Sequence, residues 1–334
     1  MNTIFEVVKA AGLRTAWSDK HPAYDLVNGP SGQGVDDLFV PEITVLDGDD
    51  ATESVEQTIA YDALNVQAVV NELTGQDSAG KQTVGVPAVL GMNFQAVSVG
   101  QKLKGDGYKN ADGEPSEGLA KALDFVDRCL ATIEATLESE KLAEKTLVVV
   151  TAKHGQSPID PAKRRIVDGN ALKAALKSAG EDVVASVTTD DVALIWLNDK
   201  SKAGEAVKAL QAKKAELAIA DVISGEALAK NYSDPANDPR APDLIVQPVA
   251  GVVYTKLTAT KLAEHGGGTP DDRHVALLVS NPSIKAAQVN EAVSTTQVAP
   301  SILEALGLKP ESLQAVEKEK TAVLPKLADA LNGK

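Results

Sequence analysis

Hydrophobic residues at helical spacing mark the expected helices of the chain. Between residues 54 and 73, apolar side chains recur every three or four positions. The clearest helix is expected over Glu117–Leu137, where one apolar stripe runs the full length and Ser116 can cap the first turn. Shorter helices are predicted over residues 3–11, 170–179, 203–217 and 296–306, the first and last ending at Gly12 and Gly307.

Short apolar runs between these helices predict strands. Residues 147–151 form a nearly continuous β-branched run, which is typical of a strand covered on both faces. Strands are also expected over residues 13–17, 88–94, 183–188, 192–197, 219–223 and 275–279. The alternation predicts an α/β fold, a doubly wound and mostly parallel sheet with helices on both faces. Ligands of such sheets bind beyond the carboxyl ends of the strands, where Lys153 and His154 fall.

The pattern also predicts how the chain is organised. We expect a core α/β domain from residues 1–160 and 256–334, with a smaller α+β excursion over residues 161–255. Residues 21–50 are rich in Gly, Pro and Asp and are expected to form a long surface connection.

Composition limits the possible functions. The chain has 334 residues, of which 43% are hydrophobic and 24% charged, an ordinary globular mixture. Its net charge of −14 argues against broad binding to a nucleic-acid backbone but allows a small phosphorylated substrate in a locally basic pocket. Cys129, the single cysteine, is expected to be buried and structural, and no cysteine metal cluster can form. We expect no membrane span and no signal peptide, and the sequence leaves the localisation open.

The segment Thr146–Gln156 is the most informative part of the chain, because a strand run leads directly into Lys153-His154-Gly155. It resembles the strand and Asp-His-Gly turn of the alkaline phosphatase superfamily, in its type I phosphodiesterase/nucleotide pyrophosphatase branch. The segment Glu264–Gly267 is similar to the last ligand histidine of that family, and residues 295–307 are similar to its C-terminal helix. The similarity keeps the family's order across nearly the whole chain.

This resemblance implies an alkaline-phosphatase-like fold and a two-metal phosphoester hydrolase. In such enzymes a pair of divalent ions, zinc being the expected one, clamps the attacking and leaving oxygens, and a Ser or Thr is the nucleophile. The resemblance places the first metal-binding Asp and the nucleophile before the helix that opens this chain. We therefore expect an N-terminally truncated protein with little or no turnover. Relatives of the family are often exported.

Several of the family's ligand positions are replaced in this sequence. Lys153 stands where the family has a metal-binding Asp, and a protonated ammonium group cannot bind a metal. Val97 and Gln101 align with a further Asp and His. His154 and His265 remain as metal-ligand candidates. Lys153 is a catalytic candidate, because its charge could replace that of a lost cation beside a phosphate.

Other residues have both a functional and a structural interpretation. Asn93, Gln101 and His21 could contact a substrate, although His21 also fits a surface loop. The run Lys163–Arg165 could attract a phosphate or be a solvated face, and residues 266–268 could bind an anion or form a flexible turn.

Three functions stay open. The first is hydrolysis of a phosphoric ester or diester near His154 and His265. The second is a catalytically silent relative that acts as an anion-binding or scaffold domain. The third is a metal-independent, transferase-like enzyme that uses Lys153 as its fixed cation.

Overall fold

The chain divides into two compact units. The computed structural model describes residues 1–20, 22–42, 45–46, 49–230 and 232–327. Unit one comprises Met1–Val99, Lys121–Lys153 and Ala276–Lys334, and unit two comprises Gly100–Ala120 and His154–Val275. The excursion predicted over residues 161–255 lies within unit two.

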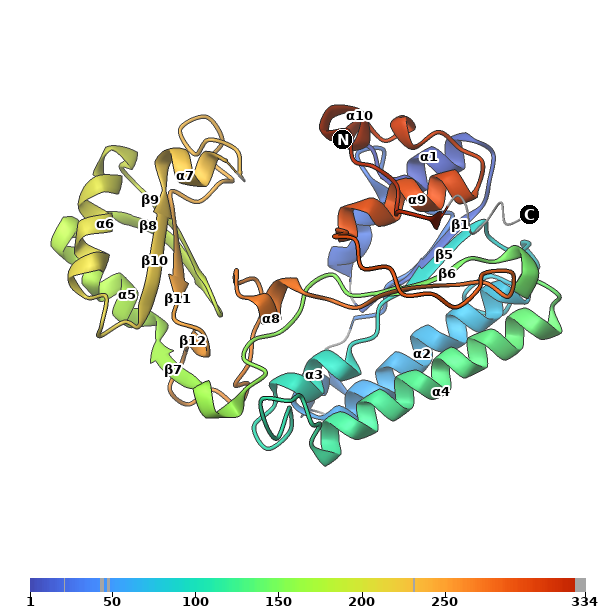
Figure 1. Cartoon of the computed structure of the whole chain (residues 1–334), viewed down its shortest axis with the longest axis horizontal. Coiled ribbons are helices and arrows are strands. Elements are labelled where there is room, and N and C mark those ends of the chain that lie inside the picture. The colour runs from blue at the N-terminus through green and yellow to red at the C-terminus, as the bar shows by residue number, and fades with distance from the viewer. Residues whose placement is uncertain (21, 43–44, 47–48, 231, 328–334) are drawn as a thin grey trace. The chain divides into compact units, whose positions relative to one another are not determined.

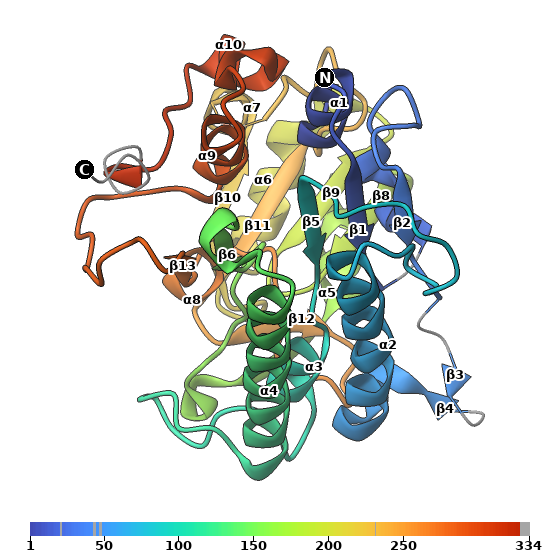
Figure 2. The ribbon, with the colours of Figure 1, turned by 90° about the vertical axis from the view of Figure 1, so that its right-hand side faces the viewer.

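Unit one contains a three-stranded parallel sheet in the order β2-β1-β5. Its strands are β1 (Thr15–Ser18), β2 (Asp37–Phe39) and β5 (Val89–Met92). Helices α1 (Ile4–Ala10) and α9 (Val298–Ala305) lie on one face, and α2 (Val55–Leu73) and α4 (Glu117–Ser139) lie on the other (Figure 1). Figure 2 shows α2 and α4 side by side. The predicted α/β architecture with helices on both faces is confirmed.

Close packing and side-chain caps stabilise this layer arrangement. The rings of Phe5 and Trp17 meet edge to face at 5.6 Å. At Gly91, a Cβ atom would lie 2.2 Å from the Trp17 ring, so only glycine fits on the neighbouring strand. The helix starts follow their local signals, since Ser54 accepts from the Gln57 amide and Ser116 from the Leu119 amide.

A second pair of strands in unit one is more exposed than the sequence predicts. β6 (Val148–Thr151) pairs antiparallel with β13 (Leu277–Ser280). The expectation that the strand over residues 147–151 is covered on both faces is wrong, because β6 is half-buried to exposed. Its partner β13 is also open to solvent, since Leu278 is 61% exposed. A β-branched run indicates strand propensity, whereas burial depends on which elements later cover it.

The connection predicted over residues 21–50 contains regular structure. β2 pairs in parallel with β1, and a 3₁₀ helix forms over Pro22–Asn28. β3 (Val45–Leu46) pairs antiparallel with β4 (Asp49–Asp50). The many Gly, Pro and Asp residues concealed these short elements, whose strands are only two or three residues long.

Unit two is built on a four-stranded antiparallel sheet in the order β10-β11-β9-β8. The strands are β8 (Val184–Thr189), β9 (Ala193–Leu197), β10 (Ile219–Ser224) and β11 (Leu244–Pro248). Helices α5 (Gly169–Leu176) and α6 (Ala203–Ala212) cover one face, and α7 (Gly225–Ala229) packs on the other (Figure 1). The predicted helix over residues 203–217 ends at Ala212, because the chain turns there to enter β10.

The remaining elements are short. β7 (Arg165–Asp168) and β12 (Val252–Thr255) form a parallel pair in unit two. α3 (Ala96–Lys102) crosses the boundary between the units, while α8 (Pro270–Arg273) belongs to unit two and α10 (Gln314–Glu319) to unit one. Among the described residues, every helix is too short or too polar to cross a bilayer.

Candidate functional site

The two His-Gly turns of the sequence meet in unit two. An antiparallel bridge joins Ser157 to Glu264, and each backbone amide donates to the other residue's carbonyl over 2.9 Å. This pairing aligns the segments that carry the two histidines. The imidazole rings of His154 and His265 stack with centroids 4.0 Å apart and 27° between their planes. Both rings are half-buried.

Glycine is required beside the first of these histidines. The Gly155 amide donates to the Asp272 carbonyl over 2.7 Å, and a Cβ atom at residue 155 would lie 1.9 Å from the Asp271 carbonyl oxygen. No other residue allows this approach of two backbones. The His154 Nδ1 atom lies 2.8 Å from the Gly155 carbonyl oxygen, a contact that orients the ring.

Gln101 joins the same turn. Its amide oxygen accepts from the Gln156 side chain over 2.9 Å, and its amide nitrogen donates to the Tyr108 hydroxyl over 2.8 Å. Gln101 is therefore held by two neutral polar partners, and one of them, Gln156, is two positions after His154 in the sequence. Its role as a substrate contact stays a prediction.

A buried pair of carboxyl groups lies against the glycine run that follows His265. Asp191 and Asp272 are 2% and 4% exposed. Burial, together with the neighbouring carboxyl group of Asp272, raises the pKa of Asp191. A Cβ atom at Gly267 would lie 2.7 Å from the Asp272 Oδ2 atom, so this glycine lets the turn close over the pair. The sequence has no local signal for these two acids, because their contact joins distant loops.

A second acidic group stands beside the bridge residue Glu264. Glu264 forms an ion pair with Lys102 over 3.0 Å. Burial raises the pKa of Asp190 to about 6, and the negative charge of Glu264 contributes to that rise. Two carboxyl groups with raised pKa values, the half-buried Asp190 and the buried Asp191, therefore lie near the turn that carries His265.

The side chains of this site do not fit the family's two-metal centre. Within the described part of the chain, no three His, Cys, Asp or Glu side chains are grouped so that they could hold one ion. A zinc ion needs at least three protein ligands in a catalytic site. His154 and His265 supply two, and Lys153 and Gln101 occupy expected ligand positions without being ligands of that kind.

The other candidates have different surroundings. Lys153 belongs to unit one, where its ammonium group donates to the Tyr24 hydroxyl over 3.1 Å. Asn93, also in unit one, donates to the Asp19 carboxylate over 3.4 Å. His21 lies outside the described residues. The roles predicted for these three residues stay predictions.

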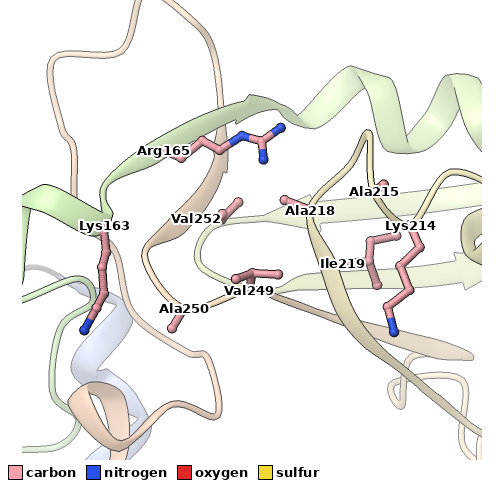
Figure 3. Close-up of a pocket in the computed structure, with 9 residues that line it drawn as sticks. All are labelled: Lys163, Arg165, Lys214, Ala215, Ala218, Ile219, Val249, Ala250 and Val252. Carbon is pink, nitrogen blue, oxygen red and sulfur yellow. The ribbon is translucent and has the colours of Figure 1, made fainter.

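The basic run Lys163–Arg165 borders a cavity of about 530 Å³ in unit two. Figure 3 shows that Lys163 and Arg165 extend in different directions around a floor that includes Val249 and Val252. Lys163 pairs with Asp160 at 3.4 Å. The run therefore spreads over a partly exposed surface and does not converge on one point.

Comparisons with known proteins agree with this fold. Human ectonucleotide pyrophosphatase/phosphodiesterase 5 is similar over 91% of this chain and 70% of its own, with a TM-score of 0.61 and 17% identity. The murine protein, in an inactive form in complex with AMP, is similar over 92% and 70%, with a TM-score of 0.60 and 16% identity. Wild-type alkaline phosphatase PafA is similar over 78% and 51%, with a TM-score of 0.52 and 16% identity.

Sequence comparisons identify the family. Comparison with curated protein sequences found no match. The family profile described as type I phosphodiesterase/nucleotide pyrophosphatase matches residues 47–270, about two thirds of the 334 residues. These residues include His154, His265 and the segments that join them. The chain therefore belongs to the type I phosphodiesterase/nucleotide pyrophosphatase family.

Proposed function

We propose that this chain handles small phosphoric esters or diesters at the paired His-Gly turns, and that it hydrolyses them slowly. The observation that carries the proposal is the stacking of His154 on His265 at 4.0 Å. Two residues 111 positions apart in the sequence meet where the family resemblance expects ligands of the phosphate site. Family membership supports the reaction class.

The chemistry available to these residues is proton transfer and hydrogen bonding. A neutral imidazole can accept a proton from an attacking group or donate one to a leaving oxygen. The contact between His154 Nδ1 and the Gly155 carbonyl fixes the ring. The Gln101 amide, held by Gln156 and Tyr108, is itself neutral and does not repel an anion.

The missing metal-ligand set limits the rate that we expect. General acid–base catalysis contributes about 10²- to 10⁴-fold, far less than the whole acceleration that phosphoester hydrolysis requires. We therefore expect turnover from the 334-residue chain that is measurable but far slower than that of a two-metal enzyme.

The shortage of metal-ligating side chains at this site favours a second candidate function. The described residues lack a group of three metal-ligating side chains, and Lys153 replaces a metal-binding acid. A domain of this kind could bind phosphorylated small molecules without hydrolysing them. Binding without turnover distinguishes this candidate from the first.

The test measures the release of p-nitrophenol from p-nitrophenyl phosphate and from bis(p-nitrophenyl) phosphate. Each ester is incubated with the full chain, in EDTA and separately with added zinc or manganese. We expect a slow rate above the buffer blank that falls at least about tenfold in His154→Ala and His265→Ala.

The matched control is His274→Ala, because His274 is exposed and follows the last residue of α8, outside the paired turns. This variant should keep the wild-type rate. A robust rate that survives both site substitutions would overturn the proposal. Binding of either ester without turnover would establish the second candidate function. Absence of both binding and turnover would exclude both candidate functions.

A further inference from the structure

Two lysine side chains of unit one meet at a single phenol. The Lys153 ammonium donates to the Tyr24 hydroxyl over 3.1 Å and lies 5.4 Å from the centroid of that ring. The Lys20 ammonium lies 5.6 Å from the same centroid. The two positive charges are close enough that Lys153 contributes to lowering the pKa of Lys20.

These residues follow the ends of strands. Lys20 comes two residues after β1, and Lys153 two residues after β6. Gln95, three residues after the parallel strand β5, accepts from the Lys20 ammonium over 2.5 Å. Ligands of α/β proteins bind at this position relative to the strands.

The nearby acids are already engaged. The Asp19 carboxylate accepts from the Trp17 indole over 3.0 Å and from the Lys20 backbone amide over 2.8 Å. Asp62 accepts from the amides of Gln95 and Ala96, and burial raises its pKa to about 7. Among the described residues, neither ammonium group forms an ion pair with a carboxylate.

Two ammonium groups therefore lie at one phenol in a protein whose net charge is −14, and the negative charge of Asp19 offsets only part of the lowering of the Lys20 pKa. Burial is the main cause that lowers the pKa of Lys20, so its charged form is poorly solvated. A dianion between the two ammonium groups would offset both the repulsion and the lost solvation. A phosphoryl group carries two charges and several acceptor oxygens, and it matches two ammonium groups and one hydroxyl better than a carboxylate does.

We infer that Lys20, Tyr24 and Lys153 form an anion site for the phosphoryl group of inorganic phosphate or a phosphomonoester. The identity of the anion rests on the proposed function, whereas the existence of the site rests on the geometry of unit one. Lysine at residue 153 would then bind phosphate directly, where the family resemblance expects a metal ligand.

The test is calorimetric titration of inorganic phosphate into the full chain in buffer that contains EDTA. We expect saturable 1:1 binding that weakens about 10- to 100-fold in Lys20→Met and in Lys153→Met, because each removes a charge-assisted hydrogen bond. Tyr24→Phe should weaken it less. The control is Lys318→Met, an exposed lysine on α10 of the same unit, which should bind as the wild type does.

Two further titrations define the ligand. AMP binding that weakens in Lys20→Met and in Lys153→Met as phosphate binding does would show that the site accepts an ester, and AMP binding that both variants leave unchanged would restrict the site to the free ion. Acetate should bind at least about tenfold more weakly than phosphate. Absence of saturable phosphate binding, equal loss in Lys318→Met, or equal affinity for acetate would each overturn the inference.

A measurement on the unaltered protein covers the case in which a variant does not fold. Acetic anhydride should label Lys20 and Lys153 more slowly in the presence of phosphate, while Lys318 is labelled at the same rate. Unchanged labelling of all three would contradict the site. His154→Ala should keep phosphate binding while it loses turnover, so failure of this inference and failure of the proposed function give different results.

Discussion

The Gly155 amide donates to the carbonyl oxygen of Asp272 over 2.7 Å. This bond fixes the first His-Gly turn to the segment that follows the second, and it explains how two rings separated by more than a hundred residues stack. It also makes the stacking sensitive to a single methyl group.

Gly155→Ala should destabilise unit two, because the new Cβ atom would lie 1.9 Å from a backbone oxygen that cannot move without breaking the turn. We expect a loss of about 2 kcal/mol or more in the free energy of unfolding. The control is Gly204→Ala in α6, where nothing lies within 4 Å of the added atom. Helix propensity predicts that this control gains about 0.5–1 kcal/mol. Urea denaturation gives the free energy of unfolding of both variants. Equal changes in Gly155→Ala and Gly204→Ala would contradict the close contact at residue 155.

Asp191→Asn should flatten the dependence of stability on pH. The folded protein raises the pKa of Asp191 above its unfolded value of about 3.9. Its stabilising contribution is therefore complete below about pH 4 and is lost as the pH rises through the folded value. The variant should lose less stability than the wild type between pH 4 and pH 9, and it should be the more stable of the two at the alkaline end. Parallel loss in both proteins, measured by urea midpoints, would rule out this explanation.

Zinc should bind weakly, because the paired turns offer only two imidazole ligands. Structural sites with four ligands bind zinc with about 10–16 kcal/mol, and two ligands should reach only a fraction of this value. Elemental analysis after dialysis should find less than one zinc per chain, and EDTA should leave the melting temperature unchanged. One equivalent of zinc that survives dialysis would show a ligand set that the described residues do not form.

Arg14→Met should destabilise unit one by leaving a buried carboxylate without its partner. Arg14 forms an ion pair with Glu72, whose side chain is only 2% exposed. Breaking a buried pair costs about 3–5 kcal/mol, and partial exposure of Arg14 places the expected loss near the lower end. Arg240→Met is the matched control, because Arg240 is exposed and pairs with Asp238 on the surface. Urea denaturation should show a large loss in the first variant and none in the second.

Local signals in the sequence predicted most helices and the main strands. Caps such as Ser54 and Ser116 act within one helical turn, so the sequence around them contains the necessary information. The fold class and the family also followed from the order of motifs. The meeting of His154 and His265 was expected from the resemblance, and the stacking shows the two rings together.

Contacts between distant segments could not be predicted in the same way. The pairing of Asp191 with Asp272 and the approach of Lys20 and Lys153 to Tyr24 depend on how separate loops pack. β11 carries hydrophobic residues without a clear flanking signal, and β12 is four residues long. The exposure of Leu278 depends on which elements cover β13 and has no local signal.

The proposed function depends on direct contact between a phosphoester and the paired His-Gly turns. Its most direct test is to follow the imidazole nitrogen resonances of the ¹⁵N-histidine-labelled chain by NMR during titration with AMP. The resonances of His154 and His265 should shift together along one saturable curve, while those of His274 should stay in place. Saturation with AMP that leaves both paired histidines unshifted would contradict this contact.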